Sequence, residues 1–436
     1  MNNSPLQNGG SCNHTTLNRV RASLARRHQA ERRFRRYGLI SILMGLSFLV
    51  LLFASIISKG YSAFLYTNIA LDIHFDSQII DPENRRDPIT MAGADYDQLW
   101  KNSLSSLFPN ITDRQQKRGL YALMGASAGQ RLRAAVAADP SLLGTTQTLL
   151  LPVDDDIDML AKGQLRINQM ETSQRLQKSV VMLGRLKTLG RVHNEINTEF
   201  FTHGDSREPD AAGIWGAMVG SALTLLITIG LSLPIGIAAA IYLEEFAPRN
   251  RWTDILEVNI NNLAAVPSIV FGLLGLAVFI NLFGLPRSSP LVGGLVLTLM
   301  TLPVIIIAGR SALKSVPPSV REAALGIGAS PMQMVIDHVL PLAMPGMMTG
   351  AIIGTARALG ESAPLLMIGM VAFIVDIPSG FTSPATVLPV QIYLWADSPE
   401  RAFTERTSAA ILVLLLFLIV MNGLAVYLRT RFERRW

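Results

Sequence analysis

The sequence predicts an all-α polytopic membrane protein with six transmembrane helices and a small α+β domain inserted between helices 1 and 2. Three observations support this fold class. Only 16% of the 436 residues are charged and the mean hydropathy is +0.35, whereas soluble proteins are usually about a quarter charged. The deficit is concentrated in long apolar runs, and runs of about 18 residues or more are typical of membrane-spanning helices. Arginine clusters flank the first and the last run.

Six apolar runs account for the six helices. Five of them contain no Asp, Glu, Lys or Arg, namely Gly38–Ser58, Ala211–Leu243, Val258–Pro286, Ser288–Gly309 and Thr407–Leu428. The sixth run, Ala343–Ile374, is interrupted only by Arg357 and Glu361. We therefore expect transmembrane helix 1 at residues 37–58 and a membrane domain at residues 211–436 that contains helices 2 to 6.

The arginines near the two ends of the chain predict its orientation. Eight arginines lie between Arg19 and Arg36, and four lie between Arg429 and Arg435. Lys and Arg are enriched beside spans on the cytoplasmic side, so both termini are predicted to be cytoplasmic, in a bacterial inner membrane. Neither a zinc-finger spacing nor an RNP motif accompanies the arginines, which argues against nucleic-acid binding. Residues 1–36 are expected to form a disordered Arg-rich tail, and the single cysteine in it excludes an internal disulfide framework.

Residues 59–210 are long enough to form a domain of their own, and the topology places them in the periplasm. Strand-like alternation and helical stretches predict a small α+β domain. The expected strands lie at Ala70–Phe75 and within Val192–Phe201, and the expected helices at Tyr96–Leu107 and Arg114–Ala138.

An acidic run within this domain, Asp154–Asp158, invites comparison with a calcium site. It lacks the spaced glycine and the distal glutamate of an EF-hand loop, so a solvated turn or a helix start is expected. The six histidines are scattered and include no HExxH-type pair. We therefore expect neither a metal site nor a cofactor.

The interior loop at residues 311–342, between spans 4 and 5, begins with a predicted short helix. Ser319 and Glu322 have the spacing of a capping box, which predicts that the helix starts at Ser319. Gly326 and Gly328 predict its end.

A second short helix is predicted in the same loop. Ser330 suits an N-cap, and Pro331 suits the first helical position. Pro341 is expected to limit how far this helix runs. The two helices should form a rigid unit at a fixed angle on the cytoplasmic face.

The run Ala343–Ile374, the fifth span in chain order, contains two opposite charges four residues apart, Arg357 and Glu361, which a helix would place on one face. Each costs about 2.5–3.5 kcal/mol near the bilayer centre on insertion scales. One interpretation is a structural ion pair that holds helices together. The other is an anion path, because a guanidinium matches the oxygens of phosphate in a bidentate manner.

The interior loop resembles the EAA motif of ATP-binding-cassette importer permeases. The matching residues are Glu322-Ala323-Ala324, Gly328 and Leu340-Pro341. His338 departs from the motif, which usually has an apolar residue there. The resemblance implies that this loop, from Ser319 onward, docks in a groove of an ATPase subunit and transmits its closure to the spans.

Three further segments, Ala356–Leu366, Asn259–Leu273 and Tyr242–Glu245, resemble phosphate permeases of the PstA type. The similarity covers about residues 210–436 together with span 1, and the domain at 59–210 departs from the shortest members. The resemblance implies a MetI-like fold in which Arg357 and Glu361 form the substrate path. It also implies partners: a second phosphate permease subunit (PstC-like), an ATP-binding-cassette ATPase dimer (PstB-like) and a periplasmic phosphate-binding protein (PstS-like).

The chain contains no GxxxxGK[ST] stretch, so it is not expected to be an enzyme, and ATP hydrolysis is expected to belong to a separate chain. Two alternatives stay open. One is a permease for another oxyanion such as molybdate or sulfate, and the other is a membrane sensor that uses its large periplasmic domain. A secondary transporter would need two similar halves with paired broken helices, and the sequence shows no such halves.

Overall fold

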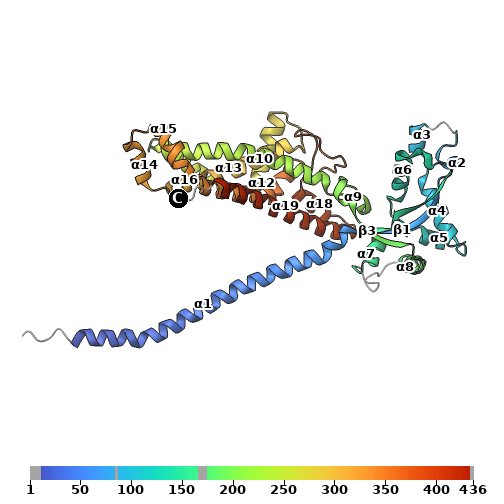
Figure 1. Ribbon diagram of the computed structural model, residues 1–436, viewed down its shortest axis with the longest axis horizontal. Coiled ribbons are helices and arrows are strands. Elements are labelled where there is room, and N and C mark those ends of the chain that lie inside the picture. The colour runs from blue at the N-terminus through green and yellow to red at the C-terminus, as the bar shows by residue number, and fades with distance from the viewer. Residues whose placement is uncertain (1–10, 84–86, 165–173, 433–436) are drawn as a thin grey trace, which may run out of the picture. The chain divides into compact units, whose positions relative to one another are not determined.

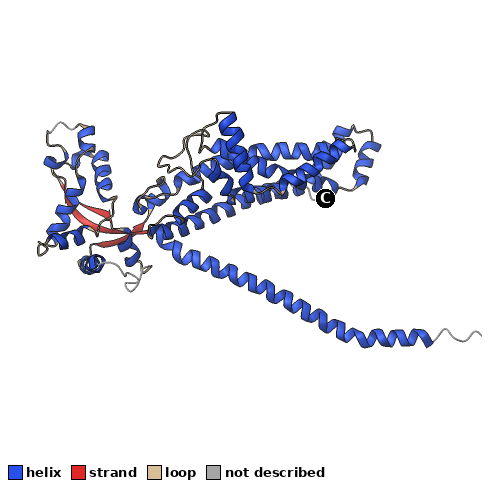
Figure 2. Cartoon of the chain, turned by 180° about the vertical axis from the view of Figure 1, so that it is seen from behind, coloured by secondary structure: helices blue, strands red, loops and turns tan. Residues whose placement is uncertain are grey.

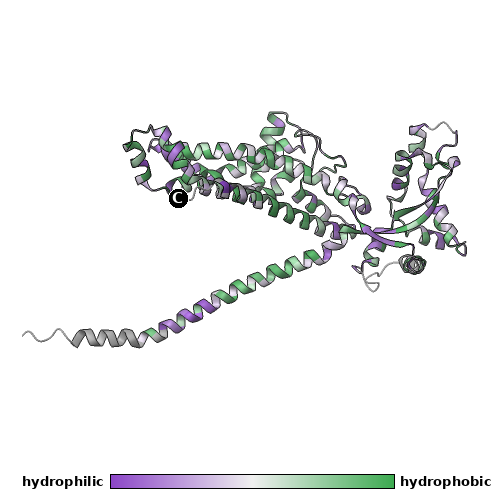
Figure 3. Ribbon diagram, viewed as in Figure 1, coloured by the Kyte–Doolittle hydropathy of each residue, from purple (hydrophilic) through white to green (hydrophobic). Residues whose placement is uncertain are grey.

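A computed structural model describes residues 11–83, 87–164 and 174–432, and the chain divides into two compact units, Met1–Ser58 and Lys59–Trp436. The described residues of the first unit belong to helix α1 (Ser11–Gly60), whose last two residues lie in the second unit and whose apolar stretch is visible in Figure 3. Large apolar side chains of this stretch are exposed, as expected for a helix surrounded by lipid. Because α1 already includes residues 11–36, the prediction of a disordered tail is wrong there. The leucines, alanines and arginines of this segment favour a helix that continues into the span. The prediction for residues 1–10 lies outside the described residues.

The second unit contains a bundle of long helices (Figures 1 and 2). They are α10 (Trp215–Ile241), α13 (Pro290–Lys314), α16 (Leu340–Gly360) and α19 (Ala402–Phe432). Among the described residues, five helices including α1 are long and apolar enough to cross a membrane, or six if one bent pair counts as a span. The predicted helical fold with about six spans is therefore confirmed.

The third predicted span, Val258–Pro286, is not a straight helix. It consists of α11 (Arg251–Ala264), α12 (Ser268–Gly275) and the π-helical η6 (Leu276–Leu282), with a bend of 101° after α11. Pro267 explains the break, because proline has no N–H for the helix and disfavours a helical conformation in the preceding residue.

The fifth predicted span, Ala343–Ile374, is also wrong in its second half. Helix α16 ends at Gly360, and a short helix α17 (Ala363–Met367) follows, packed against α12. Residues 371–387 then run without a regular helix to α18 (Leu388–Ala396). A run of apolar residues therefore does not by itself fix the length of a helix.

Small residues allow the long helices to pack closely. A Cβ atom on Gly346 would lie 2.7 Å from the side chain of Ala312, and one on Gly309 would lie 2.8 Å from that of Ala240. Gly350 likewise faces Ala308. This packing of α16 on α13 and of α13 on α10 places the three helices in direct contact along much of their length.

A sheet domain (residues 65–196) is built on three antiparallel strands in the order β2-β1-β3. The strands are β1 (Leu65–His74), β2 (Thr146–Pro152) and β3 (Val192–Ile196). Its helices are α2 (Ser77–Ile80), α3 (Pro88–Ala92), α4 (Tyr96–Leu107), α5 (Arg114–Tyr121), α6 (Ala128–Ala138), α7 (Asp155–Ala161) and α8 (Gln174–Thr188). The register pairs Leu71 with Leu149 and Thr67 with Asn194, and Ile69, Leu71 and Ile73 are fully buried in the core.

Two details of this domain differ from the sequence prediction. The helix expected over Arg114–Ala138 is interrupted between α5 and α6. At the break, Met124 forms a β-bridge with Val153 and Gly125 lies against backbone oxygens of that strand end, so tertiary contacts override helix propensity. The strand expected within Val192–Phe201 ends at Ile196, and helix α9 (Thr198–Thr202) follows.

A buried ion cluster joins the sheet domain to helix α19. Lys162 Nζ lies 2.5 Å from Asp158 Oδ2 and 3.4 Å from Glu405 Oε1, and each of these side chains is at most 8% exposed. The guanidinium of the adjacent Arg406 lies over the rings of Tyr66 and Phe200. The acidic run begins a helix with Asp154 as its N-cap, so the expected helix start is confirmed. Asp158 is nevertheless not solvated, because it is paired inside this junction.

Candidate functional site

The interior loop forms an elbow (residues 318–333) made of helix α14 (Pro318–Gly326) and helix α15 (Pro331–Gln333). The N-cap position of α14 is Pro317, so the predicted capping box of Ser319 and Glu322 is wrong. Proline at the first helical position starts the helix instead, because its φ is already helical and its missing N–H needs no partner there. Ser319 lies in the first turn with an exposed side chain.

The predicted break between the two helices is confirmed. Helix α14 ends at Gly326, and Gly328 has a φ of +91°, a conformation that side chains with a Cβ rarely adopt. Ser330 then caps α15, accepting from the backbone N–H of Gln333 and donating its own N–H to that side chain. This is a complete capping box.

Pro341 does not end the second helix. Helix α15 continues through a π-helical turn, η7 (Met334–Val339), directly into α16. A proline ring clashes with the carbonyl four residues earlier in a regular α-helix, and here that carbonyl belongs to Asp337, inside the widened turn. The π turn thus accommodates Pro341, and the elbow is continuous with a long membrane helix.

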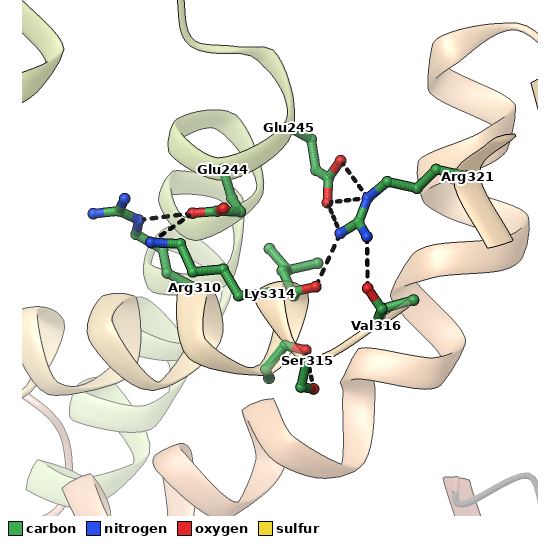
Figure 4. Close-up of polar contacts among 9 residues, drawn as sticks. Glu244, Glu245, Arg310, Lys314, Ser315, Val316 and Arg321 are labelled. Atoms are coloured by element: carbon green, nitrogen blue, oxygen red, sulfur yellow. Dashed lines mark hydrogen bonds and ion pairs between the residues drawn. The ribbon is translucent and has the colours of Figure 1, made fainter. Parts of the chain in front are cut away.

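Arg321 fixes α14 to the end of helix α10. Its guanidinium donates to both carboxylate oxygens of Glu245, with Nη2 2.6 Å from Oε1. It also donates to the carbonyls of Leu313 at 2.9 Å and Val316 at 2.7 Å (Figure 4). The side chain of Glu245 is only 7% exposed, and its hydrogen bonds with Arg321 raise the pKa of Arg321 above its ordinary value.

A second set of ion pairs lies beside the first and joins α10, α11 and α13. Arg310 Nε lies 3.2 Å from Glu244 and Arg310 Nη1 lies 3.0 Å from Glu257, while Lys314 lies 3.7 Å from Glu244 (Figure 4 shows the Glu244 pairs). The carboxylates of Glu244 and Glu245 come from η5 (Tyr242–Phe246), the π-helical end of α10. The elbow itself is thus held by the ion pair of Arg321 with Glu245, while the second set holds the ends of α10, α11 and α13 together.

The elbow and the π turn η7 that follows it carry both buried and exposed apolar side chains. Ala324, Val335 and Val339 are buried in a cluster with residues of α10, α13 and α16, and Leu340 packs against that cluster. Glu322 and Ala323 are exposed, together with four large apolar side chains: Leu325, Ile327 and Met332 of the elbow and Ile336 of η7. Ile327 alone is 81% exposed. Apolar groups gathered on a rigid surface are typical of a protein-binding site.

Arg357 and Glu361 lie at the end of α16. Helix α16 stops at Gly360 and Glu361 has an extended backbone, so the two residues do not share a helical face as predicted. They are nevertheless close, with Arg357 Nε 3.6 Å from Glu361 Oε1. Their side chains are 45% and 22% exposed, so this surface of the single chain presents charge inside a predicted span.

The ion pairs of Glu245 with Arg321 and of Glu244 with Arg310 were not predicted from the sequence. The sequence does contain a signal for these pairs. Glu244 and Glu245 directly follow the apolar run Ala211–Leu243, and Arg310 directly follows the run Ser288–Gly309. The contact between Lys162 and Glu405 was not predicted either, because it joins residues far apart in the sequence.

Two family models match the N-terminal and the C-terminal part of the chain separately. Residues 232–435 match the family of the binding-protein-dependent transport system inner membrane component. Residues 21–171 match a domain family of unknown function, DUF3333.

Several relatives are similar to about half of this chain. The chain is 31% identical over 228 residues to phosphate transport system permease protein PstA 1 of Mycobacterium tuberculosis, covering 52% of this chain and 74% of that protein. It is 30% identical to phosphate transport system permease protein PstA of Yersinia pestis, covering 49% and 71%. It is 29% identical to probable ABC transporter permease protein YqgI of Bacillus subtilis, covering 56% and 86%. The solved MetNI methionine ABC transporter aligns with 51% of this chain and 95% of that chain, at 18% identity and a TM-score of 0.40.

Proposed function

Since this chain belongs to the PstA-type permeases of the binding-protein-dependent transport family, we propose that it is a transmembrane subunit of an ATP-driven phosphate importer. It would form the translocation path with a second, PstC-like permease. A PstB-like ATPase dimer would supply the energy, and a PstS-like periplasmic protein would deliver phosphate. In this arrangement both termini and the elbow are cytoplasmic, and the sheet domain is periplasmic.

The observation that carries this proposal is the elbow itself. It offers exposed apolar side chains for a partner, and Arg321 and the buried side chains tie it to α10, α13 and α16. A force applied by an ATPase at Ile327 and its neighbours would therefore reach the membrane helices rather than bend a loop. That is the property that coupling requires.

Arg357 and Glu361 would line the path. The exposed guanidinium of Arg357 can offer phosphate two donors, and Glu361 at 3.6 Å moderates that charge, so the anion can be released. The surface around them would be covered by the second permease rather than by lipid, because a charge facing lipid is expensive.

Transport measurements test the path. Phosphate uptake into proteoliposomes containing the reconstituted complex should be abolished by Arg357→Ala and unaffected by Arg287→Ala, a control at an exposed arginine. Uptake of phosphate at the wild-type rate by Arg357→Ala would remove the proposed role of Arg357. Competition by molybdate or sulfate stronger than by phosphate itself would reassign the substrate to another oxyanion.

Co-purification tests the docking surface. An ATPase subunit should be recovered with the wild-type chain, and Ile327→Asp should weaken that association by roughly 10-fold or more, as for a central apolar contact. Ile89→Asp, at an 82% exposed site in the sheet domain, should leave it unchanged. Labelling of a cysteine at Gln333 from the periplasmic side would contradict the proposed topology.

A further inference from the structure

The sheet domain contains a cavity that the transport proposal does not use. It has a volume of about 410 Å³ and lies between α3, α4 and α6. Sites for small organic ligands typically have about 300–1,000 Å³. The cavity is therefore large enough for a molecule of some ten non-hydrogen atoms.

The wall of the cavity is mostly apolar. Met91, Ala92, Val136 and Ala137 line it together with the ring of Tyr96. The hydroxyl of Tyr96 already donates its proton to the carbonyl of Met91 at 3.0 Å, so it has no proton left to donate to a ligand. Such a surface favours an aliphatic or aromatic group over a polar one.

Arg133 supplies the charge of the lining. Within the part of the chain that the structure describes, no carboxylate lies within ion-pair distance of it, and its side chain is exposed at the rim. A guanidinium without a counter-charge, next to an apolar wall, matches a carboxylate attached to a hydrocarbon group.

Three aspartates adjoin the lining in sequence, and each is directed to a helix start. Asp87 accepts from the N–H groups of Ile89 and Thr90, and Asp95 accepts from that of Gln98. Asp139 accepts from the N–H of Ser141. Their charge is thus directed to the backbone donors of helix N-termini and does not neutralise Arg133.

We propose that this cavity binds a small amphipathic carboxylate, with the hydrocarbon part against Met91 and Val136 and the carboxylate on Arg133. This site is independent of the phosphate path, so the two proposals stand or fall separately. It assigns a ligand-binding role to the sheet domain.

Helix α6 connects the cavity to the start of the membrane helices. It carries Arg133 and Val136 at the cavity, and two residues before Arg133, Arg131 lies 3.0 Å from Glu199 of α9. At its N-terminus, the N–H of Ser127 donates to Asp210 at 2.9 Å, five residues before α10. Binding at Arg133 would therefore stabilise a helix that holds the entry to α10.

Calorimetric titration of the full-length protein in nanodiscs tests the binding, with octanoate as the probe and empty nanodiscs as the reference for lipid partitioning. We expect saturable binding with a Kd of about 1 mM, which suits a ligand of this size. Arg133→Gln should weaken it about tenfold, the usual effect of losing a charged hydrogen bond. Ala92→Phe, which fills the cavity, should abolish it, and Arg114→Gln, at an exposed arginine of the same domain, should not change it.

Each alternative result is decisive. An absence of saturable heat up to about ten times the expected Kd, or equal binding by wild type and Ala92→Phe, would overturn the site. Binding of 1-octanol as tight as that of octanoate would overturn the role of Arg133. In hydrogen exchange, octanoate should protect residues 128–138 and 209–215 in the wild type, and protection that stops at the cavity would overturn the connection through α6. Phosphate uptake is not a readout in any of these measurements, so failure of one proposal does not affect the other.

Discussion

Replacing Arg321 with Met is the sharpest test of how the elbow is held. Methionine keeps a long unbranched side chain in place of the hydrocarbon stem of arginine, and the change removes the guanidinium. In the structure that group lies 2.6 Å from Glu245 and donates to two backbone carbonyls at 2.7 and 2.9 Å. Because the Glu245 side chain is only 7% exposed, its carboxylate would be left nearly buried without a counter-charge.

The expected cost follows from this burial. Removing one partner of a buried ion pair typically costs about 3–5 kcal/mol. Arg321 is itself 22% exposed and water reaches part of the site, so we expect a value near the lower end, about 3 kcal/mol. The elbow should exchange its amide hydrogens faster at residues 318–333, and ATP hydrolysis by the reconstituted complex should continue while phosphate uptake falls.

A double-mutant cycle separates the ion pair from other effects. Glu245→Gln keeps the shape of the side chain, and the Arg321→Met, Glu245→Gln double variant should recover part of the loss, with a coupling energy of about 1–3 kcal/mol. Arg249→Met serves as the matched control, because Arg249 is exposed in the loop that follows Glu245. If Arg321→Met showed the exchange and uptake of the wild type, or if the cycle gave zero coupling, the ion pair would not be what holds the elbow.

Three further predictions concern packing, the junction and pH. Gly350→Val should lower the midpoint of thermal unfolding, with a cost of about 1–3 kcal/mol from overpacking against α13, whereas Gly360→Val, with no atom within 4 Å of its added Cβ, should cost far less; equal shifts would contradict the close approach. Lys162→Met should loosen the sheet domain and speed its proteolysis, because it leaves two buried carboxylates unpaired, while Lys101→Met, which breaks a surface pair at 3.9 Å, should be nearly neutral. Burial and the neighbouring Asp156 raise the pKa of Asp154 to about 6 from 3.8, so the folded state binds more protons than the unfolded state between these values. The free energy of unfolding should therefore fall as the pH rises from about 4 to 6, and Asp154→Asn should flatten that slope in denaturant titrations.

The local chemistry of the elbow could be predicted where it depends on neighbouring residues. Gly328 and the Ser330-Pro331 start behaved as expected because turn and cap geometry is set within a few residues. Pro341 did not, because a proline can be accommodated by a π turn when the helix on both sides is held by packing. The end of α16 was likewise not predicted from the length of the apolar run, because it depends on Gly360 and on the contact of α17 with α12.

Contacts between segments far apart in the chain could not be predicted from the sequence. The pairing of Lys162 with Glu405 spans 243 positions, and no local pattern distinguishes a buried aspartate such as Asp158 from a solvated one. Charge density alone suggested a solvated run, since isolated acidic clusters are usually exposed. In the structure the run starts helix α7, and Lys162 at the end of that helix pairs both with Asp158 and with Glu405 of α19.

Helix α10 connects the two ends of this unit in a way that constrains the mechanism. At one end, Asp210 and α9 tie its start to the sheet domain through α6. At the other end, Glu245 ties its π-helical turn to the elbow. Interiors this closely packed have little room to absorb strain, and α10 lies against α13 along its length with small residues at the contact. A displacement of the elbow is therefore expected to move α10 and α13 together, and a ligand that stiffens the sheet domain is expected to oppose that movement at its far end. Fixing the start of α10 should thus reduce transport without altering either Arg357 or the surface of the elbow.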